Sequence, residues 1–324
     1  MKRTILLTNQ YQGTPFKILE EAVGDDFYLL MLPRVDKEAL LEAIGQADYL
    51  LVSGRLKVDR DLVLAAKKLR MVQRTGVGLD NIDLDALKNC GIPLYVNRGV
   101  NAISVAEHTV MLMLSALKKS YMVNRQMRDG IWKKQETGLK THEIFGRTIG
   151  LIGMGHIGKL TAQRLSAFGV KIIYYDRIRL SPEEERSLGV SYLDQEALLR
   201  QADILSLHCG LNKDNEYLIN RKSIALMKDG AVLVNTARGR LVCEDDLADA
   251  LASGKISACG IDTFEEEPPK SISRLAAFDQ ALLSPHIGGV SYEAFSRMME
   301  KAVYNISMYD QGRLEEIEGN RIIG

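Results

Sequence analysis

The chain has 324 residues, of which 46% are apolar, and its 42 lysines and arginines balance its 42 aspartates and glutamates. This composition is typical of a folded protein, the length favours two domains, and zero net charge excludes bulk electrostatic attraction to nucleic acid or to a membrane surface. No apolar run approaches the roughly 18 residues of a membrane-spanning helix, and the apolar stretch near the first residue is too short for a signal peptide. The four cysteines lie far apart without the spacing of a zinc site, so we expect free thiols, no metal and a cytoplasmic location.

Short β-rich runs alternate with helical patterns over the first hundred residues. We expect strands at 4–8, 27–32, 49–52, 71–73 and 94–96, and helices between them at 16–23, 37–44, 59–67 and 84–89. Alternation of this kind builds a parallel sheet with helices on both faces. The segment is therefore predicted to form a first α/β unit.

A pattern rich in alanine, methionine and leucine, from 104 to about 128, predicts one long helix that could bridge two domains. In the second alternating series that follows, we expect strands at 148–152, 171–175, 204–208, 231–235 and 258–262, and helices at 157–168, 195–202, 221–227 and 245–253. The last predicted helix, 292–309, has no strand after it in this series, so its apolar face is expected to pack on the first unit. We predict two doubly wound parallel-sheet α/β domains, of residues 1–100 plus 288–324 and of residues 101–287.

The pattern GxGxxG occupies residues 153–158, directly after a predicted strand and at the start of a predicted helix. The first glycine permits a tight turn, the second lets backbone amides approach a pyrophosphate, and the third lets helix and strand pack closely. Asp176 ends the next strand, where its carboxylate can accept hydrogen bonds from the adenosine ribose and would repel the additional phosphate of NADP. Arg177 and Arg179 follow it and could offset part of that repulsion. We predict an NAD site whose loop residues are Gly153, Gly155, His156, Ile157 and Gly158.

Charged and titratable side chains follow other predicted strands of the second series. Arg238 lies just beyond the strand 231–235, where open α/β sheets bind ligands, and its guanidinium could hold a carboxylate through two parallel hydrogen bonds. Arg240 lies in the same loop and competes for that role. His286 lies in a glycine-containing loop, and histidine is the natural proton donor for the alkoxide that forms when a ketone accepts a hydride. A carboxylate beside it, from the acidic run 265–267, would stabilise the imidazolium and fix its tautomer.

Over nearly its whole length the chain resembles the D-isomer-specific 2-hydroxyacid dehydrogenases. Besides the glycine loop with Asp176, the resemblance rests on the segments 76–83, 105–109, 207–208, 235–239, 262–269 and 285–289. It implies that Arg238 binds the substrate carboxylate, that His286 is the acid/base, and that Glu267 is the partner of His286. Glu265 and Glu266 are then expected to be solvated bystanders.

The same resemblance implies further contacts and an assembly. Asp262 would bond the nicotinamide carboxamide, and the backbone amides of Val77 and Gly78 would hold the substrate carboxylate. The other residues expected to line the NAD site are Thr109, His208, Cys209 and Ala237. The family fold implies two Rossmann- or flavodoxin-like domains that flank an active-site cleft, and a homodimer formed through the segment of about 121–145.

One loop, residues 52–57, departs from the pattern of the phosphoglycerate enzymes in this family. Ser53 stands where the resemblance would place their phosphate-binding arginine, which weakens the case for a phosphorylated substrate. Arg55, Lys57 and Arg74 could still supply charge for an anionic substrate. Ser53 and Arg74 are therefore candidate substrate contacts, and the substrate side chain stays open.

Two other functions compete with this interpretation. Non-catalytic NAD-sensing scaffolds of the corepressor type share the architecture, but we see no charged or proline-rich extension of the kind that carries docking motifs. An enzyme acting on phosphite or formate could use the same cofactor domain, although Arg238, Glu267 and His286 together suit oxoacids better. We predict reversible hydride transfer between NAD and C2 of a small 2-hydroxy acid of D configuration.

Overall fold

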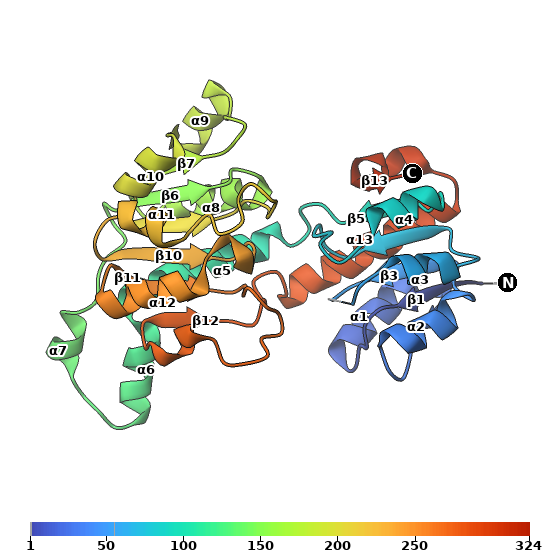
Figure 1. The fold of residues 1–324 in the computed structure, drawn as a ribbon, viewed down its shortest axis with the longest axis horizontal. Coiled ribbons are helices and arrows are strands. Elements are labelled where there is room, and N and C mark those ends of the chain that lie inside the picture. Colours follow the sequence, from blue (N-terminus) through green and yellow to red (C-terminus); the bar gives the residue numbers. More distant parts are fainter. Residues whose placement is uncertain (1, 55) are drawn as a thin grey trace. The chain divides into compact units, whose positions relative to one another are not determined.

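The computed structural model describes residues 2–54 and 56–324, which fold into two compact units (Figure 1). The first unit combines the residues up to Asn101 with the segment Tyr292–Gly324, and the second unit is Ala102–Ser291. Each unit has its own largely parallel sheet with helices packed against it. The prediction of two parallel-sheet α/β domains is confirmed.

The first unit contains a six-stranded sheet with the strand order β13-β5-β4-β3-β1-β2. The parallel strands are β1 (Arg3–Leu7), β2 (Phe27–Leu30), β3 (Tyr49–Val52), β4 (Met71–Arg74) and β5 (Leu94–Val96), and β13 (Arg321–Ile323) pairs antiparallel with β5. Without β13 the order is 2-1-3-4-5, as in flavodoxin-like sheets, and the order reverses between β1 and β3. Ligands of such sheets bind at this switch point, outside the carboxyl ends of the strands.

Helices cover both faces of the first sheet. They are α1 (Thr14–Val23), α2 (Lys37–Ile44), α3 (Arg60–Ala65), α4 (Leu84–Asn89) and α13 (Tyr292–Asp310). Successive residues of a strand point to opposite faces, so Ile5 and Leu7 share a core with α1 and α13, whereas Leu6 shares a core with α2, α3 and α4. The last helix, α13, therefore packs on the sheet of the first unit.

The second unit contains a seven-stranded parallel sheet with the order β12-β11-β10-β9-β6-β7-β8. Its strands are β6 (Thr148–Ile152), β7 (Lys171–Tyr175), β8 (Val190–Tyr192), β9 (Ile204–Leu207), β10 (Ala231–Asn235), β11 (Ile256–Ile261) and β12 (Ala281–Leu283). Counted from β6, the order is 3-2-1-4-5-6-7, which is the Rossmann order with its switch point between β6 and β9. The sequence did not predict the three-residue edge strands β8 and β12, which are only partly buried, whereas the three residues of the predicted strand β5 are all buried.

The described part of the second unit contains eight α-helices. They are α5 (Ala102–Lys118), α6 (Ser120–Arg128), α7 (Lys134–Gly138), α8 (His156–Ser166), α9 (Pro182–Leu188), α10 (Gln195–Gln201), α11 (Arg221–Leu226) and α12 (Glu244–Ser253). The prediction of one helix over 104–128 was wrong. Lys119 adopts a left-handed backbone with φ 51°, which ends α5 and starts α6, and no glycine or proline nearby signals the break.

The described residues contain no helix that is both long and apolar enough to cross a bilayer. Within the same residues, no group of three or more histidine, cysteine, aspartate or glutamate side chains is placed to hold a metal ion.

Candidate active site

Three of the predicted functional side chains follow strands that are neighbours in the second sheet. Arg238 follows β10, Asp262 follows β11, and His286 follows β12. Because parallel strands end at the same edge of a sheet, the loops that carry these residues lie next to one another. The structure therefore gathers these residues at one sheet edge.

His286 and Glu267 form a hydrogen-bonded pair. Nδ1 of His286 lies 2.8 Å from Oε2 of Glu267, and the other carboxylate oxygen accepts the backbone N–H of Phe264 at 2.8 Å. The carboxylate is therefore held from both sides. Because Nδ1 donates its proton to Glu267, the tautomer is fixed and Nε2 is the ring nitrogen left to exchange a proton with a substrate.

The segment 284–288, here called the histidine loop, is fastened to the buried carboxylate of Asp262. Oδ1 accepts hydrogen bonds from the Ser284 hydroxyl at 2.6 Å and from the Ile287 backbone at 2.9 Å, and Oδ2 accepts the Gly288 N–H at 2.9 Å. Burial alone would raise the pKa of Asp262, but the hydrogen bonds from His108, Ser284 and the two amides outweigh it and lower the pKa. Asp262 is therefore a charged anchor for the histidine loop, a role that the sequence did not reveal.

The two arginines of the loop after β10, which the sequence could not distinguish, have different environments in the structure. Asn235 shapes this loop: its Oδ1 accepts the N–H of Ala237 at 3.0 Å, and its Nδ2 donates to the carbonyl of Arg238 at 2.9 Å. The Arg240 side chain is 53% exposed and forms an ion pair with Glu216, whereas Arg238 is partly buried. Arg238 is therefore the better candidate for binding a substrate carboxylate.

Gly239 joins the arginine loop to the segment that carries Glu267. A β-carbon placed on Gly239 would collide with the backbone carbonyl of Phe264. Only glycine allows this close approach of two backbones. The loop of Arg238 is therefore packed directly against the residues that precede Glu267.

Glu265 is not the solvated bystander that the resemblance implied. Its carboxylate accepts the N–H of Glu244 at 2.7 Å and the hydroxyl of Tyr217 at 3.1 Å, and its own N–H donates to the Glu244 carboxylate at 2.8 Å. This pairing fastens the acidic segment to the start of α12. Glu266 is exposed and pairs with Lys270 across 2.5 Å, as expected of a solvated residue.

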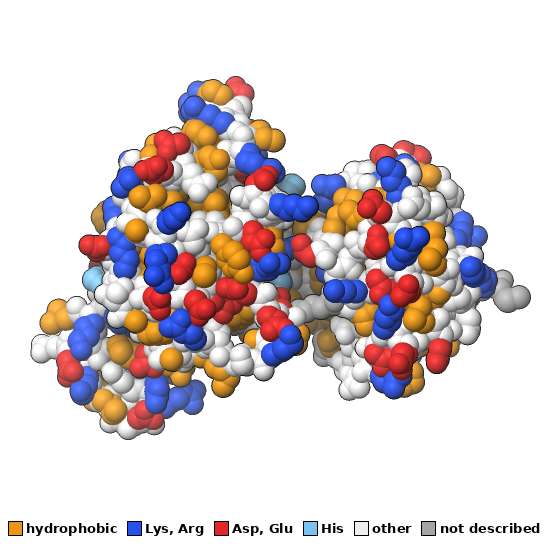
Figure 2. Space-filling model, in the orientation of Figure 1, with side chains coloured by type: hydrophobic (Ala, Val, Ile, Leu, Met, Phe, Trp, Pro, Cys, Tyr) orange, Lys and Arg blue, Asp and Glu red, His pale blue; other side chains and the backbone are white. Residues whose placement is uncertain are grey.

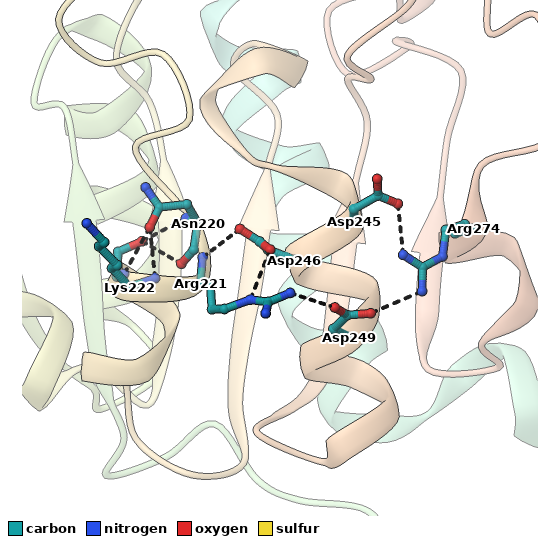
Figure 3. Close-up of polar contacts among 8 residues, drawn as sticks. Asn220, Arg221, Lys222, Asp245, Asp246, Asp249 and Arg274 are labelled. Atoms are coloured by element: carbon teal, nitrogen blue, oxygen red, sulfur yellow. Dashed lines mark hydrogen bonds and ion pairs between the residues drawn. The ribbon is translucent and has the colours of Figure 1, made fainter.

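Ion pairs on the surface hold the chain that follows this acidic segment (Figure 3). Arg274, at the start of the 3-10 helix η2 (Arg274–Ala277), pairs with Asp245 and Asp249 of α12, at 2.8 and 3.1 Å. Asp249 also pairs with Arg221 of α11 at 3.0 Å. Exposed pairs of this kind each stabilise little, but the shared carboxylate links three elements in one network.

A cavity of about 590 Å³ opens at the carboxyl ends of β6, β7 and β9, next to the switch point of the second sheet. The predicted residues Gly153, Gly155, Asp176, His208 and Cys209 line it. The other lining residues are Ile152, Tyr175, Arg177, Gln195, Gly210, Leu211, Asn212, Asp214, Asn215 and Leu218. Thr109 has a different environment, because it is buried and its hydroxyl donates to the carbonyl of Val105.

The glycine loop has the geometry that a pyrophosphate requires. Gly153 has φ 100°, and a β-carbon on it would lie 2.6 Å from the backbone nitrogen of Cys209, while a β-carbon on Gly158 would collide with the carbonyl of Gly153. A β-carbon on Gly155 would meet nothing within 4 Å, and no side chain caps the N-terminus of α8 there. The free space and the uncapped amides suit an anion at this helix end, so these residues fit a dinucleotide.

Asp176 lies where the adenosine ribose of a dinucleotide would be expected. Its Oδ2 accepts the N–H of Met154 at 2.7 Å, which ties the end of β7 to the glycine loop. Arg179 is committed elsewhere, because it makes two hydrogen bonds with Glu185, of 2.8 and 3.0 Å, and lies over the ring of Tyr192. Of the two arginines that could offset the charge of Asp176, only Arg177 lines the cavity.

Burial controls the protonation of two further side chains of the cavity wall. It lowers the pKa of His208 to about 4, so the ring is neutral at neutral pH. Nε2 of this ring is 3.0 Å from the Ser206 hydroxyl, and Nδ1 is buried without a hydrogen-bond partner among the described residues. Burial also raises the pKa of Cys209 to about 11, so its thiol stays protonated and is a poor nucleophile.

The predicted substrate contacts of the first unit cluster at the carboxyl ends of its own strands. Ser53 follows β3 and is buried, and its hydroxyl accepts a hydrogen bond of 2.6 Å from Tyr11, which follows β1. Arg74 ends β4 and donates to the carbonyls of Gly54 at 3.0 Å and Gly78 at 3.2 Å. The sequence missed Tyr11, because one aromatic residue in a polar loop carries no periodicity or motif.

Two more residues of the first unit were predicted from the sequence to bear on substrate binding. Val77 is 52% exposed, in the loop that Arg74 braces. Arg55, a possible source of positive charge, lies outside the described residues. The predicted site residues thus form two groups, one in the second unit and one in the first unit.

A Rossmann-ordered unit that combines a dinucleotide cavity with a histidine–carboxylate pair at the same sheet edge defines a nicotinamide-dependent dehydrogenase. Residues 110–288, which lie within the second unit, match the family model described as D-isomer specific 2-hydroxyacid dehydrogenase, NAD binding domain. The chain belongs to the family of D-isomer-specific 2-hydroxyacid dehydrogenases.

Two sequence relatives and one solved structure are consistent with membership of this family. The chain is 40% identical to a hydroxypyruvate reductase of Thermotoga maritima, over 82% of this chain and 85% of the relative. It is also 40% identical to a D-3-phosphoglycerate dehydrogenase of Methanocaldococcus jannaschii, over 90% of this chain but only 54% of that longer relative. Among solved structures, D-lactate dehydrogenase from Aquifex aeolicus complexed with NAD and lactic acid is similar with a TM-score of 0.87, 29% identity and 99% coverage of both chains. The protein is an NAD-dependent oxidoreductase of 2-hydroxy acids, and the corepressor alternative receives no support.

Proposed function

We propose that His286, Glu267 and Arg238 carry out the reaction of this dehydrogenase, which transfers a hydride between NAD and C2 of a small D-2-hydroxy acid or 2-oxo acid. The observation that carries the proposal is the 2.8 Å contact between Nδ1 of His286 and Glu267, in loops that adjoin the loop of Arg238. This pair provides a proton donor with a fixed tautomer next to a carboxylate-binding group.

In the direction of reduction, each of the three residues has its own role in binding or protonating the oxoacid. Arg238 holds the substrate carboxylate through parallel hydrogen bonds, which places the C2 carbonyl in a constant position. Nε2 of His286 donates a proton to the oxygen of C2 as that oxygen gains negative charge, and Glu267 stabilises the imidazolium before the transfer. NADH, when bound, supplies the hydride. In the reverse direction, His286 accepts the proton from the hydroxyl.

Within this proposal, the second unit is the NAD-binding domain and the first unit is the substrate domain. Gly153, Gly155 and the amides at the start of α8 would hold the pyrophosphate, and Asp176 would accept hydrogen bonds from the ribose. Because Asp176 would repel an additional phosphate and Arg179 is paired with Glu185, we infer a preference for NAD over NADP. A higher kcat/KM with NADPH than with NADH would contradict this preference.

The first unit supports a substrate with a small uncharged side chain. Ser53 is turned inward to Tyr11, and the guanidinium of Arg74 is bonded to backbone carbonyls. Hydroxypyruvate fits this environment, because its hydroxyl can bond with polar groups without needing a cation. The relative named hydroxypyruvate reductase is consistent with the proposal.

The proposal is tested by mixing purified protein and NADH with a panel of 2-oxo acids and following NADH absorbance. The panel comprises glyoxylate, hydroxypyruvate, pyruvate, phenylpyruvate, 2-oxoglutarate and phosphohydroxypyruvate. We expect the largest kcat/KM with a small uncharged acid such as hydroxypyruvate or glyoxylate. Turnover of none of them, with NADH binding intact, would contradict the proposed reaction, and a preference for phosphohydroxypyruvate would contradict the proposed substrate class.

We also propose that the chain forms a homodimer through the segment 121–145. In this segment the side chains of Trp132, Leu139 and Phe145 are 76%, 86% and 73% exposed, and Figure 2 shows hydrophobic side chains among charged ones over α6 and α7, at the lower left. Large apolar side chains exposed together on one segment are typical of an interface. A dimer mass in light scattering that falls to the monomer mass in the variant Trp132→Glu/Leu139→Glu would support this proposal, and a wild-type monomer would contradict it.

We also propose that the protein is located in a reducing compartment such as the cytoplasm. All four cysteines are free, and burial raises the pKa of Cys209 and Cys259. Cell fractionation tests this directly, since recovery outside the cytoplasmic fraction would contradict it.

A further inference from the structure

Two side chains on one face of α5 hydrogen-bond to the histidine loop. The Ser104 hydroxyl donates to the carbonyl of Gly288 at 2.7 Å, and Nε2 of His108 lies 3.0 Å from the hydroxyl oxygen of Ser284. Ser104 and His108 are four residues apart, so they lie one turn apart on the same side of the helix. The two contacts hold both ends of the loop that presents His286.

The direction of the hydrogen bonds identifies the proton that His108 carries. The Ser284 hydroxyl has a single proton, which it donates to Oδ1 of Asp262 at 2.6 Å. Its oxygen therefore accepts from Nε2–H of His108. The same Nε2 lies 3.5 Å from Oδ1 of Asp262, so the ring also faces a carboxylate side chain that is only 2% exposed and already accepts three hydrogen bonds.

Packing leaves the loop little freedom in this position. A β-carbon on Gly288 would lie 2.9 Å from Oδ2 of Asp262 and 3.3 Å from Cδ2 of His108, so the loop backbone is wedged between these two side chains. His286 adopts a left-handed backbone with φ 56°, a conformation that a residue with a β-carbon keeps only when its surroundings enforce it. The contacts from α5 and Asp262 supply that enforcement.

We propose that His108 is a positioning residue for His286: through Nε2–H it fixes Ser284 and Asp262, and thereby holds the histidine loop in the turn that points Nδ1 of His286 at Glu267. The effect of His108 on turnover rests on the proposed function, in which His286 is the acid/base. Its effect on the loop does not, because the tautomer of His286 can be measured in the free protein.

The test compares two substitutions that differ in which property of the ring they keep. His108→Phe keeps an aromatic ring against Gly288 but removes the donor, whereas His108→Gln keeps an N–H at nearly the reach of Nε2 and removes the ring. We expect His108→Phe to lower kcat roughly ten- to a hundredfold with little change in the KM for NADH, and His108→Gln to restore most of it. The reverse order, with glutamine worse than phenylalanine, would show a packing role and overturn the proposal.

Ring nitrogen chemical shifts of His286 provide the second readout. In the wild type and in His108→Gln we expect the proton of the neutral ring on Nδ1, and in His108→Phe a mixture of the two tautomers. If His108→Phe does not fold, Ser284→Ala removes the bridging hydroxyl with a smaller change in volume, and we expect the same mixture. Tyr28→Phe, at an exposed position of the first unit, is the control. An unchanged tautomer in every folded variant overturns the proposal, whether or not any oxoacid is reduced.

Discussion

The histidine loop of the second unit and the loop 74–78 of the first unit are both fastened by buried polar groups, but the chemistry of the two anchors differs. Asp262, a carboxylate, draws three hydrogen-bond donors of the histidine loop toward one point. The loop 74–78 is instead held by amide groups: Gln73 donates to the carbonyl of Arg74 at 2.8 Å, and Asn97 donates its backbone N–H to the carbonyl of Gly76 at 3.3 Å.

The amides of the first unit form a network that spans distant parts of the chain. Nδ2 of Asn305, on α13, donates to Gln73 at 3.1 Å and to Asn97 at 3.2 Å, and all three side chains are buried. An amide both donates and accepts, so it can bridge several elements, whereas a carboxylate only accepts and can gather many donors into a tight turn. The charged anchor therefore suits the strained turn at His286, and the neutral network suits a loop that must be joined to α13.

Replacing the charged anchor is expected to have the largest effect. In Asp262→Asn one oxygen becomes an NH₂ group, which meets the N–H donors of the histidine loop instead of accepting from them. We expect urea unfolding to show a loss of about 3 kcal/mol and kcat to fall more than tenfold. Asp229→Asn, at an exposed site paired with Lys255, is the matched control and should change stability little. If the two variants lost similar stability, Asp262 would not be an anchor.

Breaking the neutral network is expected to have a smaller and different effect. Asn305→Leu leaves the buried carbonyl oxygen of Gln73 without this donor, which should cost about 2 kcal/mol in urea unfolding. Because the network supports the loop of Val77, we expect the KM for the oxoacid to rise more than kcat falls. The exposed Asn89→Leu is the control. A fall in kcat with an unchanged KM would instead place the network in the support of the chemical step.

The smallest expected effect concerns acid pH, to which the two units should respond differently. His208 in the second unit has a pKa lowered by burial to about 4, so the unfolded chain, with a histidine pKa of roughly 6.5, takes up a proton first as the pH falls. Stability is therefore lost between about pH 6.5 and 4. The full difference corresponds to roughly 3 kcal/mol, and because the residue as a whole is partly exposed, solvent screening should reduce it to about 1–2 kcal/mol.

Unfolding by urea at pH 7 and at pH 5, in the wild type and in His208→Gln, measures this loss. The variant should be less sensitive to pH, and hydrogen exchange should place the difference in peptides of the second unit. The amide network of the first unit has no group that titrates in this range. The same pH dependence in wild type and variant would show that His208 is not responsible.

Motifs and periodicity predicted most of the fold, because buried strands and amphipathic helices repeat their apolar residues. The bounds 49–52, 148–152 and 231–235 agree with β3, β6 and β10 to the residue. Contacts that depend on tertiary structure escaped prediction. The break at Lys119 has no local signal, and the roles of Asp262, His108 and Tyr11 arise only when loops far apart in sequence meet.

The measurement that tests the central proposal most directly is the turnover of His286→Ala with NADH and the best 2-oxo acid of the panel. Removing the acid/base should lower kcat roughly a hundredfold to ten-thousandfold and leave the Kd for NADH nearly unchanged, because the cofactor cavity lies around other residues. Turnover close to that of the wild type would contradict the assignment of His286 as the proton donor.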